Sequence, residues 1–228
     1  MALNIVSKID NRVTIKHVLL SVSDKTGLDT FVPALIAACP EVKLLSTGGT
    51  YTALQKMLTQ EQAAKHLVSV SDYTGQPEMQ GGLVKTLDFK IYLGILSETY
   101  NEAHQQDLQR TRAVAIDMVV VNLYPFKQAI ANPDVTPESA RTNIDIGGPC
   151  MVRASAKNYL RVASVTDPVD YPALITELKS QKGTLSLETR LALMKKAFAH
   201  TAAYDTAIAE FFARATPERV AQTYQLPS

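Results

Sequence analysis

Short apolar runs alternate along the chain with longer segments in which apolar residues recur at helical spacing. Runs of strand length cover residues 17–22, 42–45, 116–123 and 161–166, and the third of these, IDMVVVNL, is the most apolar. Each of the first two runs is followed by a polar loop and then by an amphipathic pattern. This alternation predicts an α/β fold with a central, mainly parallel sheet flanked by helices, and it places 116–123 at the centre of that sheet.

Other segments complete the expected elements. Residues 98–112 are typical of a polar surface helix, and 65–70 suit a short strand. The stretch 71–82, SDYTGQPEMQGG, holds too many Gly, Pro and small polar residues for regular structure. Apolar residues at helical spacing over 186–215 predict a long C-terminal helix, and the pattern leaves open a break near Thr201.

Length, charge and cysteine content limit the classes of protein. With 228 residues the chain can form one large domain, and its net charge of +1 gives no basic surface for nucleic acid. It has neither a run of about 18 apolar residues nor a signal-peptide pattern, so we expect no membrane span and no export. Cys39 and Cys150 are far apart and the four histidines are scattered, which favours a cytoplasmic protein without a metal site.

Two loops rich in Ser, Thr and Gly follow the first two predicted strands. They are SDKTG at 23–27 and STGGT at 46–50, and both lead into predicted helices. Because the carboxyl ends of parallel strands share one edge of a sheet, both loops and both helix N-termini should meet there, beside Lys25. The pair predicts a phosphate site, although either loop alone is also typical of an ordinary helix cap. Neither loop matches the glycine motifs of dinucleotide or nucleoside-triphosphate sites.

The stretch 143–158, NIDIGGPCMVRASAKN, concentrates polar residues around a predicted helix start. Its glycine pair lets the backbone approach a bound group, and the proline after the pair suits the first turn of a helix. Asp145 then stands just before the helix, while Arg153 and Lys157 share one face of it. The alternative is a capped core helix with two solvated cations, and this stretch alone does not decide between the two.

Further candidates stand at or near other strand ends. Asn122 and Tyr124 stand at the carboxyl end of the most apolar run, so they should lie at the same edge as the Ser/Thr/Gly loops. A tyrosine at a strand end often serves packing alone. Lys85 is a lone cation between apolar neighbours, and a solvated strand lysine is the alternative there.

Taken together, eight blocks resemble one family, the inosine monophosphate (IMP) cyclohydrolase domain that forms the N-terminal half of a bifunctional purine-biosynthesis protein. In chain order the blocks are SVSDKTGL (21–28), LLSTGGT (44–50), SDYTGQPEM (71–79), VKTL (84–87), VVVNLYPF (119–126), NIDIGGP with RASAKN (143–158), SLETR (186–190) and KAFAHTAAYD (196–205).

The resemblance implies a methylglyoxal-synthase-like fold with an added C-terminal helical layer. It covers about residues 17–212, so we expect a lead-in over 1–15, a cyclohydrolase-like domain over 16–215 and a tail over 216–228. The formyl-transferring half of the family has no counterpart in these residues. The resemblance further implies a homodimer, and it leaves room for a separately encoded formyltransferase.

The implied reaction closes the ring of a purine-precursor ribonucleotide, 5-formamidoimidazole-4-carboxamide ribotide, to IMP with loss of water, without a metal or other cofactor. Carried over by position, the residues expected to hold the 5′-phosphate are Ser21, Ser23, Lys25, Thr26, Ser46, Gly49 and Thr50. Those expected at the base and its developing oxyanion are Lys85, Thr86 and Asn122. The expected proton-handling group is Tyr124, Asp145 and Lys157, with the backbone of Ile146 and Gly147 against the base.

One block departs from the family. Residues 82–96 read GLVKTLDFKIYLGIL where the family pattern is GRVKTLHPKIHGGIL, so an Arg and two imidazoles near the base are replaced. Two alternatives to the cyclohydrolase therefore stay open: the same scaffold acting on a related ribotide, and a nucleotide-binding or regulatory module without chemistry. Methylglyoxal synthase itself is disfavoured, because the NLYPF and IDIGG blocks belong to the cyclohydrolase pattern.

Overall fold

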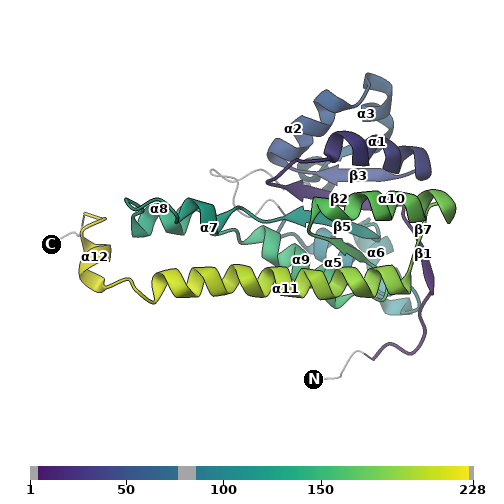
Figure 1. Cartoon of the computed structure of the whole chain (residues 1–228). Coiled ribbons are helices and arrows are strands. Elements are labelled where there is room, and N and C mark those ends of the chain that lie inside the picture. Colours follow the sequence, from purple (N-terminus) through teal and green to yellow (C-terminus); the bar gives the residue numbers. More distant parts are fainter. Residues whose placement is uncertain (1–4, 77–85, 226–228) are drawn as a thin grey trace.

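The computed structural model describes residues 5–76 and 86–225, and within them a parallel sheet forms the centre of the molecule (Figure 1). Its strand order is β4-β3-β2-β5-β6, and every pairing is parallel, which confirms the predicted sheet. The strands are β2 (His17–Val22), β3 (Lys43–Ser46), β4 (Leu67–Ser69), β5 (Met118–Asn122) and β6 (Ala163–Val165).

The middle strand is β2, so the prediction that 116–123 is central is wrong by one position. Both strands are buried on both faces, and apolar character therefore cannot rank them. In β2, Leu20 pairs with Ser46 of β3 and Val22 pairs with Asn122 of β5. This register brings the carboxyl ends of the three strands, and the polar residues that follow them, to the same edge.

Helices cover both faces of the sheet, and side chains alternate between two cores. Val18, Leu20 and Val22 of β2 belong to one core, while Leu19 belongs to the other. The helices of the first core are α1 (Leu28–Ala38), α2 (Gly48–Met57) and α10 (Tyr171–Ser180). Those of the second core are α5 (Phe89–Leu96), α9 (Gly147–Lys157) and α11 (Leu187–Phe212).

Short elements complete the described chain. Strands β1 (Arg12–Thr14) and β7 (Thr184–Ser186) form a separate antiparallel pair, so the expected lead-in contains a strand. The remaining helices are α3 (Gln60–His66), α4 (Val70–Thr74), α6 (Glu102–Thr111), α7 (Phe126–Ala129), α8 (Pro137–Thr142), the 3₁₀ turn η2 (Pro168–Asp170) and α12 (Pro217–Ala221).

Local predictions fare unevenly. Helix α6 confirms the polar helix predicted over 98–112, whereas only 67–69 of the predicted strand 65–70 is a strand. The segment 71–82 begins inside α4, which runs to Thr74, and not with irregular chain, and its residues 77–82 lie outside the described part. The tail expected over 216–228 contains α12, and the three domain boundaries stay predictions.

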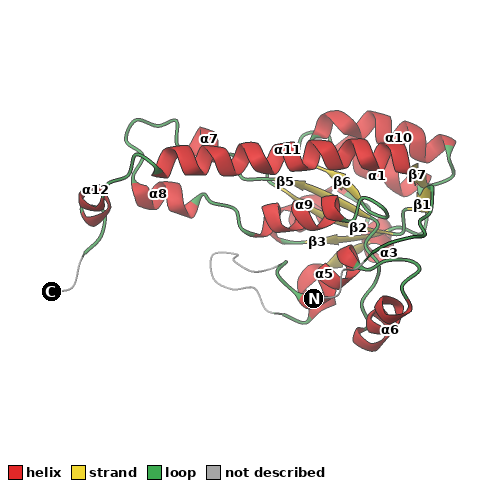
Figure 2. Cartoon of the chain, turned by 90° about the horizontal axis from the view of Figure 1, so that it is seen from below, coloured by secondary structure: helices red, strands yellow, loops and turns green. Residues whose placement is uncertain are grey.

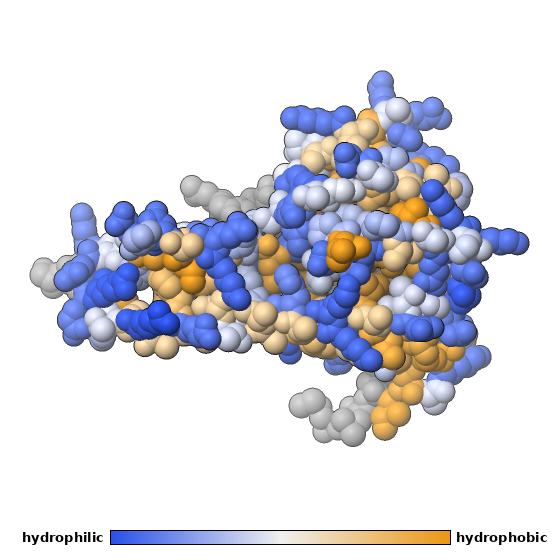
Figure 3. All heavy atoms as spheres, viewed as in Figure 1, coloured by the Kyte–Doolittle hydropathy of each residue, from blue (hydrophilic) through white to orange (hydrophobic). Residues whose placement is uncertain are grey.

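The C-terminal helix α11 is continuous over 26 residues, about 39 Å at 1.5 Å per residue, so the break that the pattern left open near Thr201 does not occur. It packs along α9 and β6 and then extends beyond the sheet, where α7 and α8 lie beside it (Figures 1 and 2). The part of α11 beyond the sheet, with α7 and α8, forms an arm on which Figure 3 shows orange apolar atoms among polar ones. Ile130, Phe211 and Phe212 of this region pack against the second core. Within the described ranges, no helix combines the length and apolar character needed to cross a membrane.

Candidate functional site

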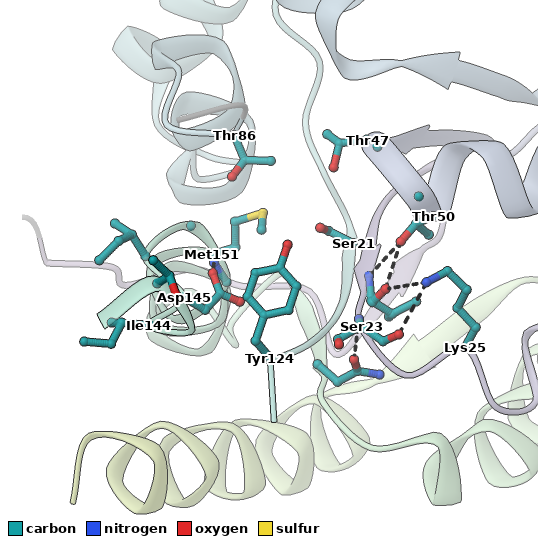
Figure 4. Close-up of a pocket in the computed structure, with 18 residues that line it drawn as sticks. Ser21, Ser23, Lys25, Thr47, Thr50, Thr86, Tyr124, Ile144, Asp145 and Met151 are labelled. Atoms are coloured by element: carbon teal, nitrogen blue, oxygen red, sulfur yellow. Dashed lines mark hydrogen bonds between the residues drawn. The ribbon is translucent and has the colours of Figure 1, made fainter. Parts of the chain in front are cut away.

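A cavity of about 550 Å³ opens at the carboxyl edge of the sheet. Figure 4 shows side chains of the Ser/Thr/Gly loops on one side, those around Asp145 on the other, and the Tyr124 ring between them. The first side is formed by Ser21, Ser23, Lys25, Thr47, Gly49 and Thr50. The second side is formed by Thr86, Tyr124, Asp145, Ile146 and Gly147, while Asn122 lies beside the first loop, and the wall is completed by Val22, Gly48, Thr142, Ile144, Gly148 and Met151.

The first loop, residues 23–27, is fixed by the side chain of Asn122. The Oδ1 atom of Asn122 accepts hydrogen bonds from the backbone N–H groups of Ser23 at 2.7 Å and Asp24 at 2.9 Å. Its Nδ2 donates to the carbonyl of Asp24 at 2.8 Å. Asn122 therefore lines the cavity as predicted, but its amide is used to hold the loop.

Lys25 supplies the cation of this side. Its Nζ donates to the carbonyls of Ser23 at 3.3 Å and Val22 at 3.5 Å, so the side chain folds back over the end of β2. A Cβ atom added to Gly49 would lie 4.0 Å from this Nζ, which places the ammonium between the two loops. An ammonium beside a helix N-terminus attracts an anion from two directions.

The second loop, residues 46–50, presents the start of α2 to the cavity. The helix begins at Gly48, and Thr47 makes no side-chain cap, so the first N–H groups of the helix are left uncapped by that side chain at a turn that lines the cavity. Thr50 ties this turn to β2, because its Oγ1 accepts from the N–H of Val22 at 3.0 Å and donates to the same residue's carbonyl at 3.1 Å.

Two residues expected at the phosphate lie off the cavity wall. Ser46 is fully buried, and its hydroxyl donates to the carbonyl of Leu20 at 2.9 Å, so it joins two strands. Thr26 turns away to Asp24, whose carboxylate accepts from its hydroxyl at 2.6 Å and from its N–H at 2.9 Å. Both side chains thus make hydrogen bonds within the protein and do not line the cavity.

Asp145 stands on the opposite side, in the connection between α8 and α9. Its carboxylate accepts hydrogen bonds from the backbone N–H of Gly148 at 2.8 Å and from that of Tyr124. Burial raises the pKa of the Asp145 carboxyl, and these two hydrogen bonds oppose that rise only in part. The group is therefore an acid or base held between two segments, with a proton affinity above that of an ordinary aspartate.

The glycine pair allows this close approach. A Cβ atom at Gly148 would overlap the Asp145 carboxylate and lie 2.7 Å from Leu123, and one at Gly147 would lie 2.8 Å from the hydroxyl of Thr86. Beside these glycines, Tyr124 is 55% exposed, and its ring stands in the cavity. The start of α9, Thr86 and Tyr124 thus form a surface suited to a flat ring.

The structure does not bring Lys157 to Asp145. Lys157 is exposed in the last turn of α9, about 15 Å along the helix from Gly147, and it does not line the cavity. Arg153, on the same face, lies over the ring of Phe198 at 5.7 Å. The catalytic role of Lys157 stays a prediction that the geometry of one chain does not support. Lys85 lies outside the described residues.

The altered block borders this side of the cavity. Asp88 caps α5, with its Oδ1 accepting from the N–H of Lys90 at 2.7 Å, and Phe89 is 61% exposed. The hydroxyl of Tyr92 is buried beside Cys150, in the first turn of α9. Leu83 lies outside the described residues.

Sequence reasoning missed part of the wall. Thr47 and Gly48 lie in the predicted Ser/Thr/Gly loop at 46–50, and Gly148 lies in the predicted glycine pair. The resemblance assigned binding roles to single residues of these segments and so left out their neighbours. Thr142 and Ile144 lie near Asp145 in sequence. Whether their side chains face the cavity depends on the path of the chain between α8 and α9, which a local pattern does not predict. Met151 follows Gly147 by four residues, so the predicted helix would have placed both on one face and indicated that Met151 lines the cavity.

Comparison with known proteins gives two family matches. Residues 28–150 match the model of the MGS-like domain, and residues 155–227 match the model described as the AICARFT/IMPCHase bienzyme. Both agree with the resemblance drawn from the sequence blocks.

Relatives cover most of the chain. The bifunctional purine biosynthesis protein PurH of Enterococcus faecalis is 45% identical over 214 residues, which are 92% of this chain and 40% of that protein. PurH of a Synechococcus species is 48% identical over 195 residues, 86% of this chain and 36% of that protein. The chain thus spans about 40% of the length of the first of these relatives. Among solved structures, that of ForH has a TM-score of 0.73 at 32% identity and covers 87% of this chain and 100% of that one.

Proposed function

Because this chain belongs to the MGS-like domain family, and its relatives are PurH proteins, we propose that it is an IMP cyclohydrolase that acts in purine biosynthesis. The observation that carries the proposal is that one cavity has an anion cradle on one side and the half-buried carboxylate of Asp145 on the other. A ribotide has its phosphate at one end and its base at the other, and the cavity offers a partner for each.

The anion cradle suits the 5′-phosphate. The N-terminus of α2, the ammonium of Lys25 and the hydroxyls of Ser21, Ser23 and Thr47 lie on one side of the cavity. A phosphate there gains from the helix dipole and from charge-assisted hydrogen bonds. The loops match no triphosphate motif, which favours a monophosphate.

The opposite side suits ring closure. In the reaction, the carboxamide nitrogen attacks the formyl carbon, and one proton moves from that nitrogen to the formyl oxygen. A second proton then moves from the formamido nitrogen to the departing hydroxyl, which leaves as water. Each step needs a group that both accepts and returns a proton next to the base.

We assign this proton transfer to Asp145, with Tyr124 beside it. The raised pKa of the Asp145 carboxyl brings its proton affinity closer to that needed to return a proton to a leaving hydroxyl. The N–H groups of Gly148 and Tyr124 hold the carboxylate in place. Tyr124 can stack against the base and present its hydroxyl to the reacting atoms, and Thr86 can bind the formyl oxygen.

An isotope experiment tests the proposal. The purified chain is mixed with the ribotide carrying ¹⁸O in its formyl group, and the nucleotide product is analysed by mass spectrometry. We expect IMP without ¹⁸O, because the formyl oxygen leaves as water. Absence of IMP, or retention of the label in it, contradicts the proposed reaction.

The altered block favours a second candidate, the same chemistry on a related ribotide. Asp88, Phe89 and Tyr92 stand where the family pattern has other residues, in the block that also supplies Thr86 to the cavity wall. Parallel assays with the standard ribotide and with ring-modified ribotides test this candidate. A higher kcat/KM for a modified base would favour it.

Three further expectations stay proposals: a homodimer, a separate formyltransferase that supplies the substrate, and a cytoplasmic location. The chain spans about 40% of the length of the first relative, and in this proposal a formyltransferase supplies the formylated ribotide. Light scattering of the purified protein tests the dimer, and a coupled assay with an added formyltransferase tests the supply of substrate.

A further inference from the structure

Tyr204, a residue of α11, lies behind the connection that carries Asp145. Its side chain is buried, with 9% exposed. Its hydroxyl accepts a hydrogen bond from the backbone N–H of Asp145 at 2.7 Å and lies 3.3 Å from the carbonyl of Asn143, to which it donates. The phenol thus uses both its acceptor and its donor on one short connection, between the end of α8 and the start of α9.

The other side of this connection lines the cavity through Ile144, Asp145 and Ile146. Asp145 is therefore held at two places: its carboxylate by the N–H groups of Gly148 and Tyr124, and its own N–H by Tyr204. A displacement of about 1 Å in a group that must meet a reacting atom can cost about 100-fold in rate. The hydrogen bond from the Asp145 N–H thus acts on the position of the carboxylate.

The ring of Tyr204 also supports the segment of Tyr124. It meets the ring of Phe126 edge to face, with centroids 6.2 Å apart and planes at 68°. Phe126 is 1% exposed and begins α7, two residues after Tyr124. One side chain from the C-terminal helix thus contacts both segments that bring the candidate catalytic groups to the cavity.

We propose that Tyr204 is a positioning residue, which sets the placement of Asp145 and Tyr124 for ring closure without touching the substrate. This inference rests on the proposed cyclohydrolase activity. It assigns to the long C-terminal helix a role in the chemistry of a cavity that its own residues do not line.

The test is Tyr204→Phe, which keeps the ring on Phe126 and removes the hydroxyl. We expect kcat to fall about 10- to 100-fold while KM for the ribotide stays within about 2-fold, because the loops that hold the phosphate are unchanged. The pH dependence of kcat should shift as well, since the surroundings of the Asp145 carboxyl change.

The matched control is Tyr73→Phe. The Tyr73 hydroxyl also accepts a backbone N–H, from Val114 at 2.8 Å, but Val114 precedes β5, at the edge of the sheet opposite the cavity. Thermal melts measure the stability of both variants. We expect similar losses of stability in the two, and a loss of kcat only in Tyr204→Phe.

A readout without turnover separates this inference from the proposed function. Amide hydrogen exchange at Asp145, followed by NMR, should be faster in Tyr204→Phe than in the wild type, because the N–H loses its acceptor. If the wild type is active and Tyr204→Phe keeps its kcat and its exchange rate, the positioning role is overturned and the cyclohydrolase stands. If the wild type closes no ring, the proposed function fails, and unchanged exchange at Asp145 would then overturn the positioning as well. Equal losses of kcat in both variants would also overturn the positioning role.

Discussion

The carboxylate of Asp145 reaches across the start of α9 and accepts the backbone N–H of Gly148 at 2.8 Å. This contact is possible because Gly148 has no side chain: a Cβ atom there would overlap the carboxylate and press on Leu123 at 2.7 Å. The absence of a side chain at Gly148 therefore fixes where the Asp145 carboxylate lies in the cavity wall.

Gly148→Ala should displace the carboxylate. We expect kcat to fall by at least about 100-fold and the free energy of unfolding to fall by about 1 to 3 kcal/mol, because the site has no room for a methyl group. Steady-state assays and denaturant melts measure the two effects. Gly147→Ala is the graded comparison, since among the described residues its methyl group would meet only the hydroxyl of Thr86, at 2.8 Å, and should cost less. Equal effects of the two substitutions would contradict this account of Gly148.

Asp145→Asn should make the protein more stable at neutral pH. Burial raises the pKa of the Asp145 carboxyl above its ordinary 3.8, so its contribution to stability is full below that value and is lost as pH rises through the folded-state pKa. Asparagine stays neutral throughout. Melts from pH 3 to pH 8 should therefore show equal stabilities in acid and an advantage of the variant that grows as pH rises, roughly over the range in which the carboxyl ionises. A variant that is less stable at pH 8 but not at pH 3 would contradict the raised pKa.

Lys25→Ala should weaken phosphate binding. Loss of a charge-assisted contact predicts a KM for the ribotide that rises about 10- to 100-fold, with a smaller change in kcat. The control is Lys56→Ala, which removes an exposed lysine from the other end of α2. Calorimetry with IMP measures the same loss without turnover. An unchanged affinity for IMP would show that the phosphate binds elsewhere.

Arg190→Met should destabilise the fold. Arg190 is fully buried, and its guanidinium donates to backbone carbonyls from three parts of the chain, those of Asp10, Tyr159, Leu160 and Leu185. Leaving these acceptors without a donor should lower the free energy of unfolding by at least about 3 kcal/mol.

The exposed pair of Arg141 and Glu138 provides the control for this prediction. Arg141→Met should change the free energy of unfolding by no more than about 1 kcal/mol, because exposed ion pairs stabilise little. Urea unfolding measures both variants. A similar small effect for Arg190→Met would contradict the structural role assigned to that side chain.

Local patterns predicted the strands, their parallel arrangement and the edge at which polar residues gather. They succeeded because apolar runs and Ser/Thr/Gly loops are short-range signals. The cavity confirms that edge: Lys25 and Asp145, which are far apart in sequence, both line it.

What local patterns could not predict depends on contacts between distant residues. Whether Asn122 faces a ligand or a loop follows from the register of β2 against β5, which no local pattern gives. Lys157 was grouped with Asp145 through a resemblance, but an 11-residue helix lies between them. The contact of Tyr204 with Asp145 joins residues 59 apart and leaves no periodic signal in the sequence.

The most direct test of the central claim compares wild-type protein with Asp145→Asn in two measurements on the same samples: conversion of 5-formamidoimidazole-4-carboxamide ribotide to IMP, and binding of IMP by calorimetry. The account predicts rapid conversion by the wild type, a loss of at least about 100-fold in the variant, and IMP affinities within about 10-fold of each other. Conversion by the variant at the wild-type rate, or binding of IMP by the wild type without any conversion, would contradict it.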